Sequence, residues 1–85
     1  MSLIEELLTV ADAYQEATRF PDSRVSWRVF GDTKKLAALR ADKDIQVKRA
    51  ESAMRWFSDN WPENASWPEL VHRPAPQRAH DGNAA

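Results

Sequence analysis

The sequence predicts an all-α fold of four to five helices. Apolar residues recur at steps of three and four between Leu3 and Ala17 and again between Val47 and Trp61, which is the spacing of one helical face. Helix is the only periodic state that the chain supports strongly. The 85 residues include no cysteine, so packed apolar side chains must hold together one small domain.

The first expected helix begins after Ser2. Ser2 can cap its start, and Glu5 three residues later would complete a capping box. Pro21 disfavours a helical conformation in the residue before it, so the helix is expected to end between Thr18 and Phe20. The face expected to meet the core carries Leu3, Ile4, Leu7, Leu8, Val10, Ala11, Tyr14 and Ala17.

The second expected helix follows Asp22 and Ser23, which are residues of the type that caps helices. Val25 and Val29 lie four residues apart, so they share the face that would be buried. Gly31 then supplies a break in the helical pattern.

The third expected helix spans residues 33–40, and Asp32 is well suited to cap it. Leu36 and Leu39 would point into the core, with Ala37 or Ala38 as a close-packing neighbour. The polar run from Arg40 to Asp44 reads as a connection to the next helix.

The last expected helix is capped by Asp44 and ended by Pro62. Its core-facing stripe is Val47, Ala50, Met54, Phe57 and Trp61. The proline-rich segment that follows predicts an extended arm, whose residues Trp61 and Trp67 lie back on the helices. One folded domain is therefore expected over residues 1–74, with a disordered tail over residues 75–85.

Charge is distributed unevenly along the chain although the net charge is only −1. Residues 23–50 contain eight Lys or Arg against three Asp, which gives +5, and they lie between segments of −4 and −2. A basic middle third favours a nucleic-acid partner. The alternative is that this basic segment pairs with the acidic ends across the fold.

Two short helices separated by a tight turn describe a helix-turn-helix, whose second helix offers its first turn to the major groove. Helix 33–40 would be the recognition helix, and the alternative is that its lysines belong to an ordinary solvated face. Base or phosphate contacts are expected from Thr33, Lys34 and Lys35, with close approach allowed by Ala38. Phosphate contacts at the flanks are expected from Arg24, Arg28 and Lys43.

The run from Ser23 to Trp61 resembles the helix-turn-helix domains of the lambda-repressor and Cro type. The features that match are "V-x-x-x-V" from Val25, "GD" at Gly31, "L-x-x-L-R" from Leu36 and the helix from Ile45. Over about residues 3–74 the chain is also similar to short alphaproteobacterial or prophage-encoded regulators. Phe30 stands where the turn most often has glycine, and Asp42 stands where glycine usually ends the recognition helix.

The resemblance implies a lambda-repressor-like fold and a sequence-specific regulator, such as a repressor, that binds double-stranded DNA. One such module makes few contacts, so a homodimer on two half-sites is expected. Possible dimer or partner contacts are Trp27, Trp56 and Trp67. Two alternatives stay open. The same fold can serve as a protein-interaction module or phage-type inhibitor, or it can bind DNA without sequence preference.

Several function classes find no support in the sequence. There is no nucleophile with a base, no phosphate-cradling glycine loop and no metal-ligand pattern, so we expect no enzyme, cofactor, metal or small-molecule substrate. No apolar run approaches the length of a membrane span. The N-terminus "MSLIEELL" carries acids where a secretory signal carries Lys or Arg, so a cytoplasmic location is expected.

Overall fold

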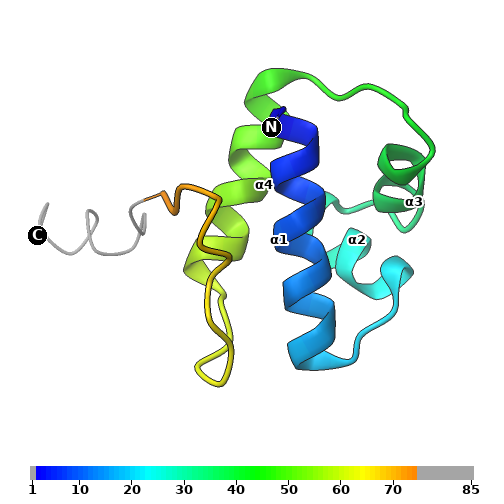
Figure 1. The fold of residues 1–85 in the computed structure, drawn as a ribbon. Helices are drawn as coiled ribbons and strands as arrows, with labels where there is room; N and C mark the ends of the chain where they lie inside the picture. Colours follow the sequence, from blue (N-terminus) through cyan, green and yellow to red (C-terminus); the bar gives the residue numbers. More distant parts are fainter. Residues whose placement is uncertain (1, 75–85) are drawn as a thin grey trace, which may run out of the picture.

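The computed structural model describes residues 2–74, which form four helices and a C-terminal arm (Figure 1). The helices are α1 (Leu3–Thr18), α2 (Asp22–Phe30), α3 (Lys35–Arg40) and α4 (Val47–Asp59). Every regular element in this described part is helical, so the all-α prediction is confirmed. The tail predicted over residues 75–85 lies outside the described residues. Between residues 2 and 74, no helix is long and apolar enough to cross a membrane.

The two long helices, α1 and α4, lie side by side and run in the same direction (Figure 1). Tyr14 of α1 is central to this contact, because its ring centroid lies 5.3 Å from that of Phe57 and 5.7 Å from that of Trp56. Edge-to-face pairs of this kind are favourable beyond the area they bury. The residues buried along the seam are Leu7, Val10, Ala11, Tyr14, Ala50, Ala53, Met54 and Phe57.

The short helices α2 and α3 pack on each other and on one flank of the α1–α4 pair (Figure 1). Val25 of α2 and Leu36 and Leu39 of α3 are buried, as their spacing predicted. Residues 41–46 form the long connection that leads from α3 to the start of α4. The helix pair 22–40 is thus carried on a scaffold that the two long helices build.

Helix ends follow the local rules at three positions. Ser2 and Glu5 form the predicted capping box, with the Glu5 amide donating to Ser2 Oγ at 3.1 Å and the Ser2 amide donating to Glu5 Oε1 at 3.0 Å. Gly31 ends α2 with a φ of +71°. Asp42 has a φ of +67°, and the amides of Asp42 and Lys43 donate to the carbonyls of Leu39 and Ala38. This Schellman arrangement ends α3 at the position where glycine is usual.

Three expectations about helix starts are wrong. Helix α3 begins at Lys35 and not at residue 33, because Asp32 Oδ1 accepts a 2.8 Å hydrogen bond from the Lys34 amide and holds residues 32–34 in a turn. Asp44 does not cap α4, which begins after Gln46 without a side-chain cap. Pro21 occupies the cap position of α2, since the Asp22 carboxylate instead accepts hydrogen bonds from Gln15 and Arg40.

The expected core stripe of α4 also needs one correction. Val47 is 63% exposed, because α4 begins at this residue and its first turn lies at the edge of the core. Ile45, two residues earlier, packs against the core in the connection. Ala50, Met54 and Phe57 are buried as predicted.

The C-terminal arm turns back beyond α4 and returns along it (Figure 1). Trp61 and Trp67 pack on each other with ring centroids 4.8 Å apart, and their indole N–H groups donate to the carbonyls of Ala65 and Val71. Ser58 Oγ donates to the Pro74 carbonyl at 2.7 Å. Trp61 also lies 6.1 Å, between ring centroids, from Tyr14 of α1, and both tryptophans pack against the core. The prediction that they lie back on the helices is therefore confirmed.

Candidate nucleic-acid interface

A buried serine sets the relation between α2 and α3. The Ser26 hydroxyl donates to the Asp32 carbonyl and accepts a 2.9 Å hydrogen bond from the Leu36 amide. It therefore satisfies one carbonyl of the turn and one free amide near the start of α3. The sequence analysis missed this residue. Its signal is a small polar residue directly beside Val25, on the face that the Val25 and Val29 pair marks as buried.

The C-terminal end of α3 is anchored by the Arg40 side chain. Its guanidinium lies 2.8 Å from Asp12 Oδ1 and 3.0 Å from Asp22 Oδ2, and it donates to Gln15 Oε1 at 2.7 Å. Partial burial opposes the charged form, but hydrogen bonds and the charges of Asp22 and Asp12 outweigh it and raise the pKa of Arg40. Arg40 is thus committed to joining α3 to α1 and α2.

The opposite end of α3 faces solvent. Thr33 and Lys34 are exposed and Lys35 is half-buried. Across the described residues neither lysine forms an ion pair, so the acids Glu5, Glu6 and Glu16 do not neutralise them. Ala38, one turn further along, is half-buried, and its methyl side chain is small enough for a partner to approach the helix closely.

Arg24 and Arg28 gather over one aromatic ring. The guanidinium carbon of Arg24 lies 4.0 Å from the centroid of the Phe20 ring, and that of Arg28 lies 5.6 Å from it. Both side chains are exposed on the outer face of α2. Trp27, on the same face, is 60% exposed.

Lys43 lies elsewhere. It follows the Schellman turn and lines a shallow hollow beside Glu5 and Leu8 of α1. Lys35 lines a different hollow, together with Gln46 and Arg49 at the start of α4. The predicted contacts thus form three groups, at Phe20, at the start of α3 and beside the start of α1.

Arg49 is a basic residue that the sequence analysis did not place among the DNA contacts. It donates to the Phe30 carbonyl at 3.3 Å and its guanidinium lies 5.7 Å from the Phe30 ring. It therefore covers the C-terminal end of α2, where a cation is favourable. Its only sequence signal was its place in the basic middle third.

The three tryptophans named as possible partner contacts differ in exposure. Trp56 packs against Tyr14 and Phe57, and Trp67 packs against Trp61 with Arg73 over its ring. Trp27 is the exposed one of the three. A partner would meet Trp27 without any rearrangement of the helices.

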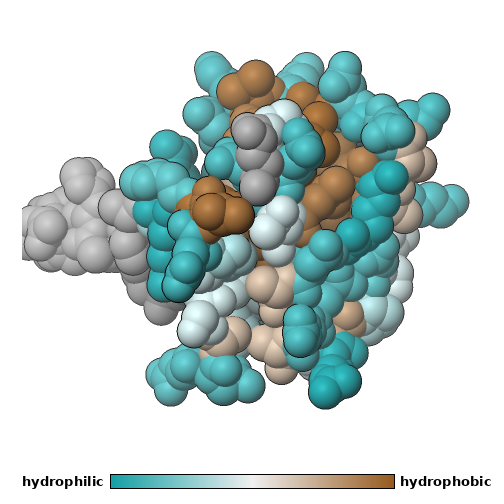
Figure 2. Space-filling view, viewed as in Figure 1, coloured by the Kyte–Doolittle hydropathy of each residue, from teal (hydrophilic) through white to brown (hydrophobic). Residues whose placement is uncertain are grey.

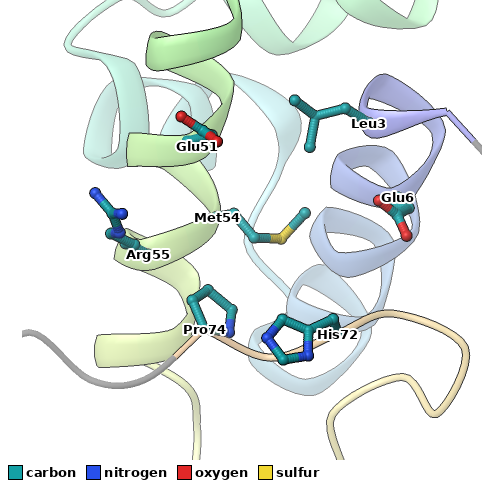
Figure 3. A pocket seen from close by; sticks show the side chains of 7 residues that line it. All are labelled: Leu3, Glu6, Glu51, Met54, Arg55, His72 and Pro74. Atoms are coloured by element: carbon teal, nitrogen blue, oxygen red, sulfur yellow. The ribbon is translucent and has the colours of Figure 1, made fainter.

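A further pocket lies outside these groups. Figure 3 shows the side chains that line a pocket between α1, α4 and the arm. The volume of this pocket, about 210 Å³, is smaller than the about 300–1,000 Å³ typical of small-molecule sites. It is lined by Leu3, Glu6, Glu51, Met54, Arg55, His72 and Pro74, and by none of the predicted DNA contacts. Figure 2 shows apolar side chains gathered between α1 and α3, where Ile4, Leu8 and Leu39 line the hollow that Lys43 borders.

Comparison with known protein families, with curated proteins and with solved structures finds no match for this chain. The lambda-repressor-like family therefore stays a prediction from the sequence.

Proposed function

We propose that this protein is a sequence-specific transcriptional regulator that binds double-stranded DNA through a lambda-repressor-like helix-turn-helix. The observation that carries the proposal is the contrast between the ends of α3. Its inner face is fixed by the buried Leu36 and Leu39 and its C-terminal end by Arg40. At its N-terminal end, Lys34 and Lys35 have no carboxylate partner in the described chain. A rigidly held helix with unpaired cations at its exposed N-terminal end has the properties that major-groove recognition requires.

The exposed residues then take distinct roles. Thr33, Lys34 and Lys35 contact base edges or phosphates, and Ala38 lets the helix approach the bases closely. Lys43 contacts a phosphate beyond the C-terminal end of α3.

We propose that two copies bind together. One module of this size makes few base contacts, and two half-sites about 34 Å apart supply the missing specificity. Sedimentation of the protein alone and with duplex DNA tests this step, and a monomer in both samples would contradict it.

Fluorescence anisotropy with mixed-sequence duplex DNA, repeated over a salt series, tests the DNA proposal. The logarithm of the affinity should fall linearly with the logarithm of the salt concentration. The variant Lys34→Ala/Lys35→Ala should flatten that slope by up to about two phosphate contacts. A matched control is Lys48→Ala/Arg55→Ala, which removes two exposed charges from α4 and should leave the slope unchanged.

A protein partner is the second candidate. The observation that favours it is the hollow between α1 and α3, in which the apolar residues Ile4, Leu8 and Leu39 lie among polar and charged ones (Figure 2). Apolar side chains rimmed by polar residues mark interaction sites in small proteins. Absence of duplex binding even at low salt would exclude the DNA proposal and favour this one.

A further inference from the structure

The pocket between α1, α4 and the arm has an apolar floor (Figure 3). Leu3 of α1 and Met54 of α4 point toward each other across it, and Met54 is only 6% exposed. Pro74 closes the pocket on the side of the arm. Its volume of about 210 Å³ is too small for a drug-sized ligand. The pocket therefore suits a small molecule with a short aliphatic part.

The rim of this pocket carries charges of both signs. Glu6 of α1 is half-buried, and Glu51 and Arg55 lie one turn apart on α4. Glu51 and Arg55 have the spacing of a helical ion pair but do not form one. Between residues 2 and 74, none of the three side chains has an ion pair or a hydrogen bond. Two carboxylates and one guanidinium thus stay available to a ligand.

The arm side of the pocket is held in place by the domain itself. Ser58 Oγ donates to the Pro74 carbonyl at 2.7 Å and accepts a 3.1 Å hydrogen bond from Arg73 Nε. The Arg73 guanidinium also donates to the Ser58 carbonyl at 2.8 Å, and Val71 is buried. Because these contacts already fix the wall next to Pro74, a ligand would not have to order it on binding.

We infer that this pocket binds a small aliphatic α-amino acid, such as leucine. The ligand carries opposite charges on adjacent groups, and the side chains of Glu51 and Arg55 offer the complementary charges from positions about 5–6 Å apart at Cβ. Its carboxylate binds the planar fork of the Arg55 guanidinium, and its ammonium group binds Glu51 with added attraction from Glu6. Its aliphatic side chain packs on Leu3 and Met54.

Both charges of the ligand are needed to match the rim. An aliphatic amine would leave the Arg55 guanidinium without a partner and place a second cation beside it. An aliphatic acid would place a third carboxylate beside Glu6 and Glu51. The inference goes beyond the proposed function and does not rest on it, because none of the predicted DNA contacts lines this pocket.

Titration of the isotope-labelled full-length protein with L-leucine, followed by NMR, tests the inference. We expect a dissociation constant on the order of 1 mM, because the ligand is small and the charged groups are partly solvated. The backbone amide signals of Glu6, Met54 and His72 should shift, whereas those of Thr33 and Lys34 should not. Absence of a saturable shift at the pocket up to the solubility limit of leucine would overturn the inference.

Three analogues of leucine separate the three parts of the site. Isopentylamine lacks the carboxylate, isocaproate lacks the ammonium group, and glycine lacks the aliphatic side chain. Each should bind at least about tenfold more weakly than leucine, because each leaves one part of the pocket without its partner. Binding of the amine or of the acid as tightly as leucine would overturn the assignment to an amino acid. Equal binding of glycine would overturn the role of the apolar floor.

Two variants connect each ligand group to one side chain. Arg55→Gln should weaken leucine binding about tenfold and should not weaken isopentylamine, which has no carboxylate. Glu51→Gln should weaken leucine binding by a similar factor and should not weaken isocaproate. Lys48→Gln is the matched control, since Lys48 is exposed on α4 outside the pocket and its loss should leave leucine binding unchanged. Equal weakening of leucine and isopentylamine by Arg55→Gln would overturn the contact between Arg55 and the carboxylate.

The outcomes are independent of those for DNA. Leucine binding in a protein that does not bind duplex DNA would support this site and overturn the regulator proposal. Duplex binding without any leucine binding would do the reverse.

Discussion

The two ends of α3 carry positive charge in opposite circumstances. At the C-terminal end Arg40 is held by Asp12, Asp22 and Gln15, which come from α1 and α2. At the N-terminal end Lys34 and Lys35 have no carboxylate partner in the part of the chain that the structure describes. Both ends of the six-residue helix are therefore held by the domain, but only the N-terminal end presents unpaired cations to a partner.

The net charge of a segment therefore does not measure how much unpaired charge it offers to a ligand. All three residues belong to the basic middle third of the sequence. Arg40 differs because Asp22 and Gln15, 18 and 25 residues earlier in the chain, fold back onto it. A charge in a network of this kind contributes to orientation, whereas an exposed and unpaired charge contributes to binding.

The largest effect is expected from the apolar anchor of α3. Leu36→Ala should lower the free energy of unfolding by about 2–5 kcal/mol, because Leu36 is fully buried and its removal leaves a cavity. Its neighbour Lys35→Ala should change that free energy by no more than about 0.5 kcal/mol. Urea denaturation measures both. Similar losses in the two variants would contradict the contrast between the anchored and open sides of the helix.

Arg40→Gln comes next. The variant should lose about 1 kcal/mol of stability, since the guanidinium is partly solvated and salt screens the pair. Lys34→Gln should be neutral, and high salt should reduce the difference between the two variants. A double-mutant cycle with Asp12→Asn isolates the ion pair, and a coupling of zero would show that this ion pair does not contribute to joining α3 to α1.

A smaller gain is expected at the end of α3. Asp42→Gly should stabilise the domain by about 0.5–1 kcal/mol, because glycine adopts the φ of +67° without the strain of a Cβ atom. Asp44→Gly is the matched control, since Asp44 lacks a positive φ and should gain nothing. Thermal unfolding compares the two. If both variants melt at a higher temperature than the wild type, the gain comes from removing an acidic side chain and not from relieving backbone strain.

The smallest effect concerns the start of α1. The hydrogen bonds from the Ser2 backbone and side chain lower the pKa of Glu5 below its ordinary value of 4.5. A lowered pKa in the folded state contributes stability at pH values above 4.5, and that contribution is lost as the pH falls through the folded pKa. Wild type should therefore lose more stability than Glu5→Gln when urea denaturation is repeated between about pH 6 and pH 3. Parallel curves for the two proteins would contradict this.

Features governed by near neighbours could be predicted from the sequence. The Ser2–Glu5 capping box, the break at Gly31 and the buried pair Leu36 and Leu39 each follow from residues within four positions of one another. The tryptophan arm was also predictable, because prolines prevent helix and large indoles seek burial.

Features that depend on distant residues were missed. The partners of Arg40 lie on other helices. Asp22, whose place in the sequence predicts a cap for α2, instead forms an ion pair with Arg40. The start of α4 was placed too early, because Asp44 has the chemistry of a cap while the chain stays extended to Gln46. Ser26 was missed because hydropathy marks its face as apolar but does not show which backbone groups the fold brings to it.

Ser26 also has a consequence for how this domain can change over time. Its hydroxyl fastens the turn and the start of α3 from inside, and the exposed side chains of Thr33, Lys34 and Ala37 make none of the hydrogen bonds that hold the two helices together. A new set of side chains at those three positions would alter what the surface recognises while the framework stays intact. The domain is therefore suited to diversification, whether by natural drift or in a randomised library that keeps position 26 as serine.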